Sequence, residues 1–254
     1  MGDLDPRFLV AASRRILANN GCESQVAGHV SMRADGEDAF WVTPFQYFDE
    51  TLPRDVCKVS FDLEVLEGDM LPSPAIQFHA AILRGRPDIG SVIHTHSHYV
   101  SVFSTTRRLI EMFNVESVLF YDDQALHEDD GILPPVEGSR LAAALGDDKH
   151  IVLIKNHGAI ITGDTIEETT IKALTLERCA RYQIEAQAIG GTVMAEAEVI
   201  RSNKKYHQYF LPQMWEANLR RLRQSDPDLF DAGAFGDIDT LALQSDRPAV
   251  VSPS

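Results

Sequence analysis

The stretch SVIHTHSHYV, residues 91–100, places three histidines at alternate positions directly after a short apolar run. Side chains two residues apart on a strand face the same side, so His94 and His96 are expected to point together from the end of a strand. A helix that starts near Ser97 would rotate His98 out of this register. The stretch therefore predicts a strand that ends in two convergent imidazoles, with His98 outside the pair.

A second strand is expected to end in an imidazole in the same way. The apolar residues 151–155 run into Asn156, His157 and Gly158, where the glycine permits a close backbone approach. Metal sites commonly take two imidazoles from one rigid element and a third from elsewhere, leaving an open position for substrate or water. A buried histidine is otherwise most often a hydrogen-bonded core residue, and spacing alone leaves that alternative open. The pattern predicts that His94, His96 and His157 are ligands of one divalent cation.

Helices and strands can be placed around these two strands from periodicity and end signals. A capped amphipathic helix starts at Asp5-Pro6 and stops at Asn20-Gly21, and a capping box at Thr165 opens a long helix that Gly190-Gly191 ends. Three short β-rich segments with turns between them predict an antiparallel meander, and helical spacing recurs twice more. These segments are 25–33, 39–43 and 56–61 for the strands, and 74–83 and 215–222 for the helices. We expect one domain over residues 1–211, followed by a C-terminal helix and a flexible tail over residues 212–254.

Composition excludes several classes of protein. Lys plus Arg total 23 and Asp plus Glu total 38, a formal charge of 23 − 38 = −15, which would repel nucleic acid and anionic lipid. Three widely spaced cysteines show no Cys-x-x-Cys pattern and predict neither a disulfide framework nor a thiolate metal site. No apolar run reaches the ~18 residues of a membrane span, and the N-terminus lacks the pattern of a secretory signal. We expect a cytoplasmic protein that acts on a small molecule, without nucleic-acid or membrane partners.

Five motifs in register resemble the class II aldolase and adducin-head family, from about residue 5 to about residue 211. They are Gly28-His-Val-Ser31, Ser73 ahead of an amphipathic helix, Arg86-Pro87-Asp88, His94-Thr-His96 and Asn156-His157-Gly158. The resemblance implies an α/β fold, a three-layer α/β/α sandwich around a largely antiparallel central sheet. It also implies a homotetramer with active sites between neighbouring subunits. In similar enzymes the residues matching His94, His96 and His157 bind a catalytic divalent cation, commonly zinc, with manganese or iron as alternatives.

The chain departs from the sugar-phosphate aldolases of that family at several positions. Their acid/base carboxylate, one helical turn before the residue matching His79, is replaced by Ala75. In the phosphate-binding motifs His29 replaces an asparagine, and Pro44 and Pro74 offer no backbone N–H to an anion. A phosphorylated sugar is therefore not expected as the substrate.

Loss of the carboxylate favours chemistry that does not need that base. A bound cation can serve as a Lewis acid and electron sink, which suits decarboxylation of a small hydroxylated, non-phosphorylated acid rather than aldol cleavage. The resemblance to decarboxylases of the family implies that this acid is aromatic. Similar decarboxylases also carry Gly-His-Val-Ser. Candidates for the group that supplies the proton are His29, or from the neighbouring subunit Tyr121, Asp122, Asp123 and His127. Candidate substrate-binding residues are Thr43, Ser73, His98, Tyr206 and Tyr209.

Three other functions remain open at this point. Three imidazoles with open coordination positions can also hold Fe(II), substrate and O₂, as in a non-heme oxygenase. An aldolase with a substituted acid/base would use the same cation. A non-enzymatic, adducin-like binding protein would have no chemical reason to keep His94, His96 and His157 together.

Overall fold

An eight-stranded mixed sheet forms the centre of the structure, a computed structural model that describes residues 4–128 and 134–230. The strands lie in the order β4-β3-β2-β1-β5-β8-β7-β6. Each neighbouring pair in these ranges is antiparallel except β6 and β7, which are parallel. The strands are β1 His29–Arg33, β2 Ala39–Val42, β3 Cys57–Ser60, β4 Val65–Glu67, β5 Ser91–Thr95, β6 Gln124–His127, β7 Ile151–Ile154 and β8 Gly158–Gly163.

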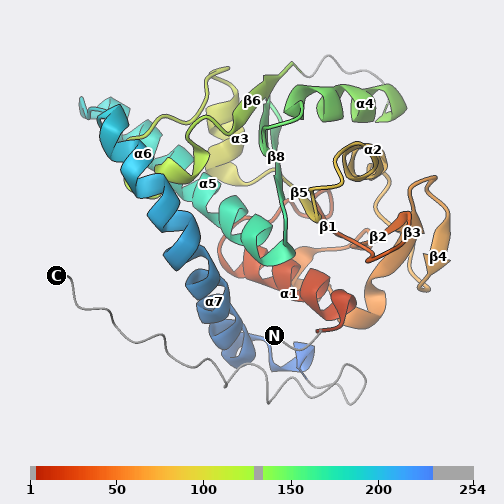
Figure 1. Cartoon of the computed structure of the whole chain (residues 1–254). Coiled ribbons are helices and arrows are strands. Elements are labelled where there is room, and N and C mark those ends of the chain that lie inside the picture. The colour runs from red at the N-terminus through yellow and green to blue at the C-terminus, as the bar shows by residue number, and fades with distance from the viewer. Residues whose placement is uncertain (1–3, 129–133, 231–254) are drawn as a thin grey trace.

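Helices cover both faces of this sheet (Figure 1). On one face one continuous apolar core joins the sheet to α1 Pro6–Asn19, α3 His98–Ser104, α5 Ile166–Ala188, α6 Glu196–Lys205 and α7 Leu211–Ser225. On the other face a second core lies under α2 Gln77–Gly85 and α4 Pro134–Leu145. The predicted three-layer α/β/α architecture with a largely antiparallel sheet is confirmed.

Alternation along the strands decides which side chains reach the α2 face. On β5, Ile93 belongs to the core beneath α1 and α5, whereas Val92 belongs to the core beneath α2. His94 has the same parity as Val92 and therefore faces α2. Register then places His29 of β1 directly opposite His94. The fold thus brings two imidazoles from neighbouring strands under one helix.

Capping signals located the helix starts well. Asp5 accepts a hydrogen bond from Arg7 N at the start of α1, and the Thr165 side chain accepts one from Glu168 N at the start of α5. The predicted helix at 74–83 begins only at Gln77, after a turn that includes Ala75. Strand β4 was not predicted because all three of its residues are exposed, so it carries no burial pattern.

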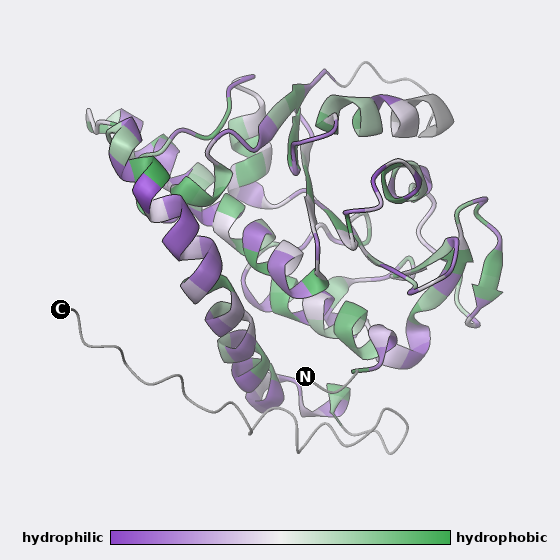
Figure 2. Ribbon diagram, viewed as in Figure 1, coloured by the Kyte–Doolittle hydropathy of each residue, from purple (hydrophilic) through white to green (hydrophobic). Residues whose placement is uncertain are grey.

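The C-terminal helix α7 packs against α1 and α5 through a narrow apolar edge. Its buried residues are Leu211, Trp215 and Leu222, while much of the helix is hydrophilic (purple in Figure 2). A π-helical turn, Tyr206–Phe210, joins α6 to α7. The domain boundary at residue 211 stays a prediction, and residues 231–254 of the predicted tail lie outside the described residues. No helix in the described ranges has the length and apolarity needed to cross a membrane.

Candidate metal centre

Three imidazoles converge where β5 ends and β8 begins. One nitrogen of each of His94, His96 and His157 lies within 4.8 Å of the others. The Nε2 atom of His96 is 2.9 Å from that of His94 and 2.8 Å from that of His157. These three residues are the predicted ligand set, and the structure brings them together as one group that contains no carboxylate.

Backbone contacts fix the orientation of this group. His94 Nδ1 lies 2.9 Å from the Ala159 carbonyl oxygen, which can only accept, so Nδ1 carries the proton and Nε2 keeps its lone pair for a cation. His96 N donates to Ser24 Oγ, and a Cβ on Gly158 would lie 2.2 Å from the Thr95 carbonyl oxygen. The backbone of Gly158 therefore approaches the end of β5 closely, as predicted, and this approach places His157 beside that end.

Burial keeps two of the ligands in the form that binds metal. Burial lowers the pKa of His94 well below its ordinary value of 6.5, and the neighbouring imidazoles of His96, His29 and His157 lower it further. Burial also lowers the pKa of His96 to about 4, with a smaller effect from His157. Both imidazoles are neutral at neutral pH, so a divalent cation need not displace protons from them. The donor set fits such a cation.

His29 and His79 form a second pair of imidazoles beside the triad. Their ring centroids lie 5.4 Å apart, and the His29 ring is 5.6 Å from that of His94. Burial lowers the pKa of both well below 6.5; the His79 ring adds to this effect on His29, as His94 does on His79. Ser31 Oγ is 2.6 Å from His79 Nδ1, and the Phe78 ring contacts the rings of His29 and His94. His29 is therefore a neutral group held against an aromatic wall.

Several buried polar atoms around this pair have no partner in the described part of the chain. They include His29 Nδ1, His79 Nε2 and Ser73 Oγ. Ser73 N lies 3.5 Å from the Thr43 carbonyl oxygen, and Thr43 Oγ1 accepts from Val30 N on β1, so the two predicted substrate-binding residues adjoin the strand that carries His29. Buried polar atoms are nearly always paired, and a bound molecule would supply the missing partners.

His98 lies at the first position of α3 and is exposed, outside the triad as expected. The start of this helix is held by Glu177 of α5, whose two carboxylate oxygens accept from Tyr99 N at 2.8 Å and Val100 N at 2.9 Å. The role of His98 in binding substrate stays a prediction. Glu177 was not identified from sequence, because its contact joins residues 77 and 78 positions apart.

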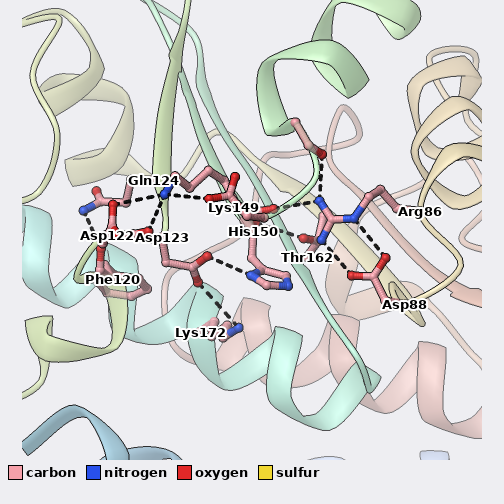
Figure 3. Close-up of polar contacts among 12 residues, drawn as sticks. Arg86, Asp88, Phe120, Asp122, Asp123, Gln124, Lys149, His150, Thr162 and Lys172 are labelled. Atoms are coloured by element: carbon pink, nitrogen blue, oxygen red, sulfur yellow. Dashed lines mark hydrogen bonds and ion pairs between the residues drawn. The ribbon is translucent and has the colours of Figure 1, made fainter. Parts of the chain in front are cut away.

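The other predicted catalytic residues lie at both ends of β6. His127 pairs with Ile154, at the end of the sheet from which His157 emerges. Tyr121, Asp122 and Asp123 precede the strand at the opposite end. Figure 3 shows this end, where Asp123 Oδ1 is 2.7 Å from His150 Nδ1 and Asp122 is paired with Lys149. One chain therefore does not gather these four residues at its own triad, and their supply by a neighbouring subunit stays a prediction.

The predicted C-terminal aromatic residues lie on the π-helical turn. Tyr206 is buried in the larger core and stacks on Phe210 at 5.0 Å, whereas Tyr209 is 61% exposed. Burial raises the pKa of Tyr206 to about 12. Within the described residues neither hydroxyl contacts the triad, so their role in binding substrate also stays a prediction.

Known proteins resemble this chain in both sequence and fold. Residues 8–184 match the family described as Class II Aldolase and Adducin N-terminal domain. Two relatives are each 32% identical over 203 residues, 77% of this chain. They are 4-hydroxy-3-prenylphenylpyruvate oxygenase/4-hydroxy-3-prenylbenzoate synthase of Streptomyces roseochromogenus subsp. oscitans, of which 73% is covered, and decarboxylase NovR of Streptomyces niveus, of which 74% is covered. A solved structure, L-fuculose 1-phosphate aldolase from Glaciozyma antarctica PI12, has a TM-score of 0.78 and 26% identity, covering 87% of this chain and 90% of that one.

Proposed function

This chain belongs to the class II aldolase and adducin N-terminal domain family, and from that premise we propose that it is a metal-dependent lyase that decarboxylates a small hydroxylated aromatic acid. The observation that carries the proposal is the composition of the site: three imidazoles converge, and among the described residues no carboxylate belongs to the group. Aldol cleavage requires a positioned base for the substrate hydroxyl, and this group provides none. The relative named as a decarboxylase supports the same choice.

The chain's own residues divide into three roles. His94, His96 and His157 would hold the cation, with zinc as the proposed ion, and the cation would supply Lewis acidity to a chelating oxygen of the substrate. Ser73 and Thr43 bind polar groups of the substrate, and the Phe78 ring forms a flat apolar wall against which an aromatic ring can pack.

Decarboxylation breaks the bond between the substrate carbon and its carboxyl carbon. CO₂ leaves, the electron pair stays on the substrate carbon, and a proton takes the place of the carboxyl group. His29 is the proposed relay for that proton, because it is buried beside His94 and its Nδ1 atom has no partner. Since its pKa lies well below 6.5, His29 is neutral and must pass on a proton taken from solvent or from a second group.

A second candidate function is an Fe(II)-dependent oxygenase. One specific observation favours it: a relative that is 32% identical to this chain carries the name of a 4-hydroxy-3-prenylphenylpyruvate oxygenase. The same three imidazoles would hold the iron and leave positions for substrate and O₂. The two candidates therefore differ in the metal and the co-substrate and agree on the ligands.

We also propose that the protein is a homotetramer in which neighbouring subunits complete each site. Exposed apolar side chains support a subunit contact near the segments that carry the proposed site. Phe45 is 51% exposed and Leu71 is 80% exposed, and both adjoin the segments that carry Thr43 and Ser73. On the edge strand β6, Leu126 is 46% exposed next to His127.

The experiment is a screen for CO₂ release from hydroxybenzoates and β-keto or β-hydroxy acids, by protein loaded with zinc, manganese or iron. Each reaction is run with and without O₂. A lyase releases CO₂ without O₂, and His94→Ala abolishes the release. Release that requires both iron and O₂ would establish the oxygenase, and an absence of release under all conditions would reject the decarboxylase proposal.

A further inference from the structure

A second group of titratable side chains lies at the end of the sheet opposite the three imidazoles. Ser91 of β5 pairs with Gly163 at this end, and the strand runs to Thr95 beside the imidazoles, so roughly 13 Å of strand separates the two groups. A cavity of about 590 Å³ lies at this end, a volume that suits a small organic molecule. Its titratable lining residues include Asp123, His150, Asp164, Glu168, Lys172 and His207.

Lys172 and two carboxylates form an ionic network at this cavity. The Lys172 side chain is 3% exposed, and its Nζ atom lies 2.8 Å from Glu168 Oε1 and 4.0 Å from Asp123 Oδ2. His150 Nδ1 lies 2.7 Å from Asp123 Oδ1, so both oxygens of Asp123 face groups of their own chain (Figure 3). One permanent positive charge therefore faces two carboxylates.

Asp164 adds a third carboxylate to the cavity. It directly follows β8, lines the cavity and is exposed. His207 Nδ1 lies 3.9 Å from Glu168 Oε1, and burial lowers the pKa of His207, so this imidazole is uncharged at neutral pH. Among the described residues that line the cavity, Lys172 is the only lysine or arginine. The cavity therefore favours a cationic ligand over an anionic one.

A metal ion is not the cation that this cavity fits. Within residues 4–128 and 134–230, only the triad at the other end of the sheet brings three ligand atoms within 4.8 Å of one another. Asp88, which also lines the cavity, is bound at two points by Arg86, at 2.9 Å and 2.7 Å. An ammonium group has three donors that can reach separate carboxylates, so an organic ammonium suits this arrangement better.

A second, more apolar cavity adjoins the first between the starts of α5 and α7. It has a volume of about 430 Å³, shares Glu168 and His207 with the first cavity, and is also lined by Leu211, Pro212 and Trp215. The indole N–H of Trp215 is buried and has no hydrogen-bond partner within the described residues. His207 belongs to the π-helical turn, and such turns are frequent at functional sites. The two cavities together offer carboxylates at one end and an apolar wall at the other.

We propose that the two cavities form a ligand site, separate from the metal centre, for a small organic amine with an apolar body. The ammonium group binds among the carboxylates of Asp123, Asp164 and Glu168. The apolar body packs against Leu211 and Trp215. This site goes beyond the proposed function and does not depend on it, because none of these residues belongs to the triad or to the groups that bind the proposed substrate.

Tryptophan fluorescence of Trp41→Phe protein measures the binding, because Trp215 is then the single tryptophan of the chain. Phenethylamine, 2-phenylethanol and 3-phenylpropanoate share one apolar body and carry a positive, a neutral and a negative group. Phenethylamine should change the fluorescence saturably, with a dissociation constant of about 1 mM or lower. It should bind about tenfold more tightly than the alcohol, and the propanoate should leave the spectrum unchanged.

Three charge-neutralising variants, each made in the Trp41→Phe protein, test the carboxylates. Glu168→Gln keeps the shape of the side chain that both cavities share, so it should weaken phenethylamine binding about tenfold and leave phenylethanol binding unchanged. Asp164→Asn changes an exposed side chain and should weaken amine binding about threefold. Asp148→Asn is the matched control, because Asp148 is 74% exposed, lines neither cavity and should not alter the affinity.

The amine preference decides the proposal. Equal affinities for the amine and the alcohol in the Trp41→Phe protein would overturn it even if Glu168→Gln did not fold, and so would an unchanged preference in a folded Glu168→Gln protein. Added zinc and the His157→Ala substitution should leave the amine affinity unchanged. Loss of amine binding on addition of zinc would place the amine at the metal ligands and would also overturn the proposal, while CO₂ release by the metal centre would be unaffected by either result.

Discussion

Replacement of His157 by alanine should remove the metal without disturbing the fold. His157 is half-buried in the turn between β7 and β8, and its backbone N donates to Ile154 O. Its backbone carbonyl accepts from Ser101 Oγ at 3.0 Å. Both contacts survive truncation to alanine, so the change is confined to the imidazole, whose Nε2 lies 2.8 Å from that of His96.

The size of the effect follows from the number of ligands. Apparent binding free energies of four-ligand zinc sites are about 10–16 kcal/mol, so one protein ligand contributes roughly 2.5–4 kcal/mol. With three imidazoles reduced to two, the dissociation constant should rise by about 10²- to 10³-fold. A cation present at 100 times its dissociation constant stabilises wild type by about 2.7 kcal/mol, and this stabilisation should be nearly absent from the variant.

The assay is metal content after dialysis against buffered zinc, together with thermal unfolding with and without the ion. Wild type should retain about one ion per chain at a free zinc concentration where His157→Ala retains almost none. His98→Ala is the matched control, because His98 is exposed and lies outside the triad. Normal metal retention and an unchanged zinc-induced shift in the melting temperature of His157→Ala would refute the ligand assignment.

Three further predictions address the surroundings of the site. Gly28→Ala should destabilise the fold by about 1–3 kcal/mol, since its Cβ would lie 2.4 Å from the buried Phe48 ring, whereas Gly85→Ala, with no atom within 4 Å, should not; urea unfolding of the two variants gives the comparison. Glu177→Ala should lose about 2 kcal/mol because two backbone N–H groups at the start of α3 lose their acceptor, and an unfolding midpoint equal to wild type would contradict this. In the metal-free protein the buried imidazoles of His29, His79 and His94 have pKa values below 6.5, so the unfolded chain takes up protons before the folded chain as the pH falls below 6.5. The free energy of unfolding should therefore decrease by about 1.4 kcal/mol per site and pH unit. A urea midpoint that rises when the pH is lowered from 7.5 to 5.5 would show that the sign is wrong.

The elements that sequence predicted well carry local signals. Asp5-Pro6 and Thr165 mark helix starts through contacts within three residues, and the apolar runs of β5 and β7 are buried along their whole length. Strand β4 lacks such a signal because it is an exposed edge. Apolar spacing predicts a helix from Pro74, whereas α2 begins at Gln77, because such spacing says little about the residue at which a helix begins.

The candidate site likewise contains residues that a local sequence pattern identifies and residues that no local pattern identifies. His94 and His96 could be paired from their spacing, while the third ligand needed the separate pattern at His157. Glu177 was missed because it binds residues 77 and 78 positions away in the sequence, a relation that no local pattern records. Tyr121 and His127 lie on either side of the four-residue strand β6, and their supply to the site by a neighbouring subunit stays a prediction.

Ala75 and Arg14 both affect the charge balance around the proposed metal ligands. Imidazoles bind a metal in their uncharged form and therefore leave the charge of a divalent cation unchanged, and no carboxylate of the described residues joins their group. Arg14 adds a further buried positive charge near His29. Ala75 adds no negative charge, so a bound ligand would have to offset the charge of the cation. An acid that chelates the cation would bring a negative charge to this cluster, so the absence of a carboxylate from the group favours the acidic substrate that we propose.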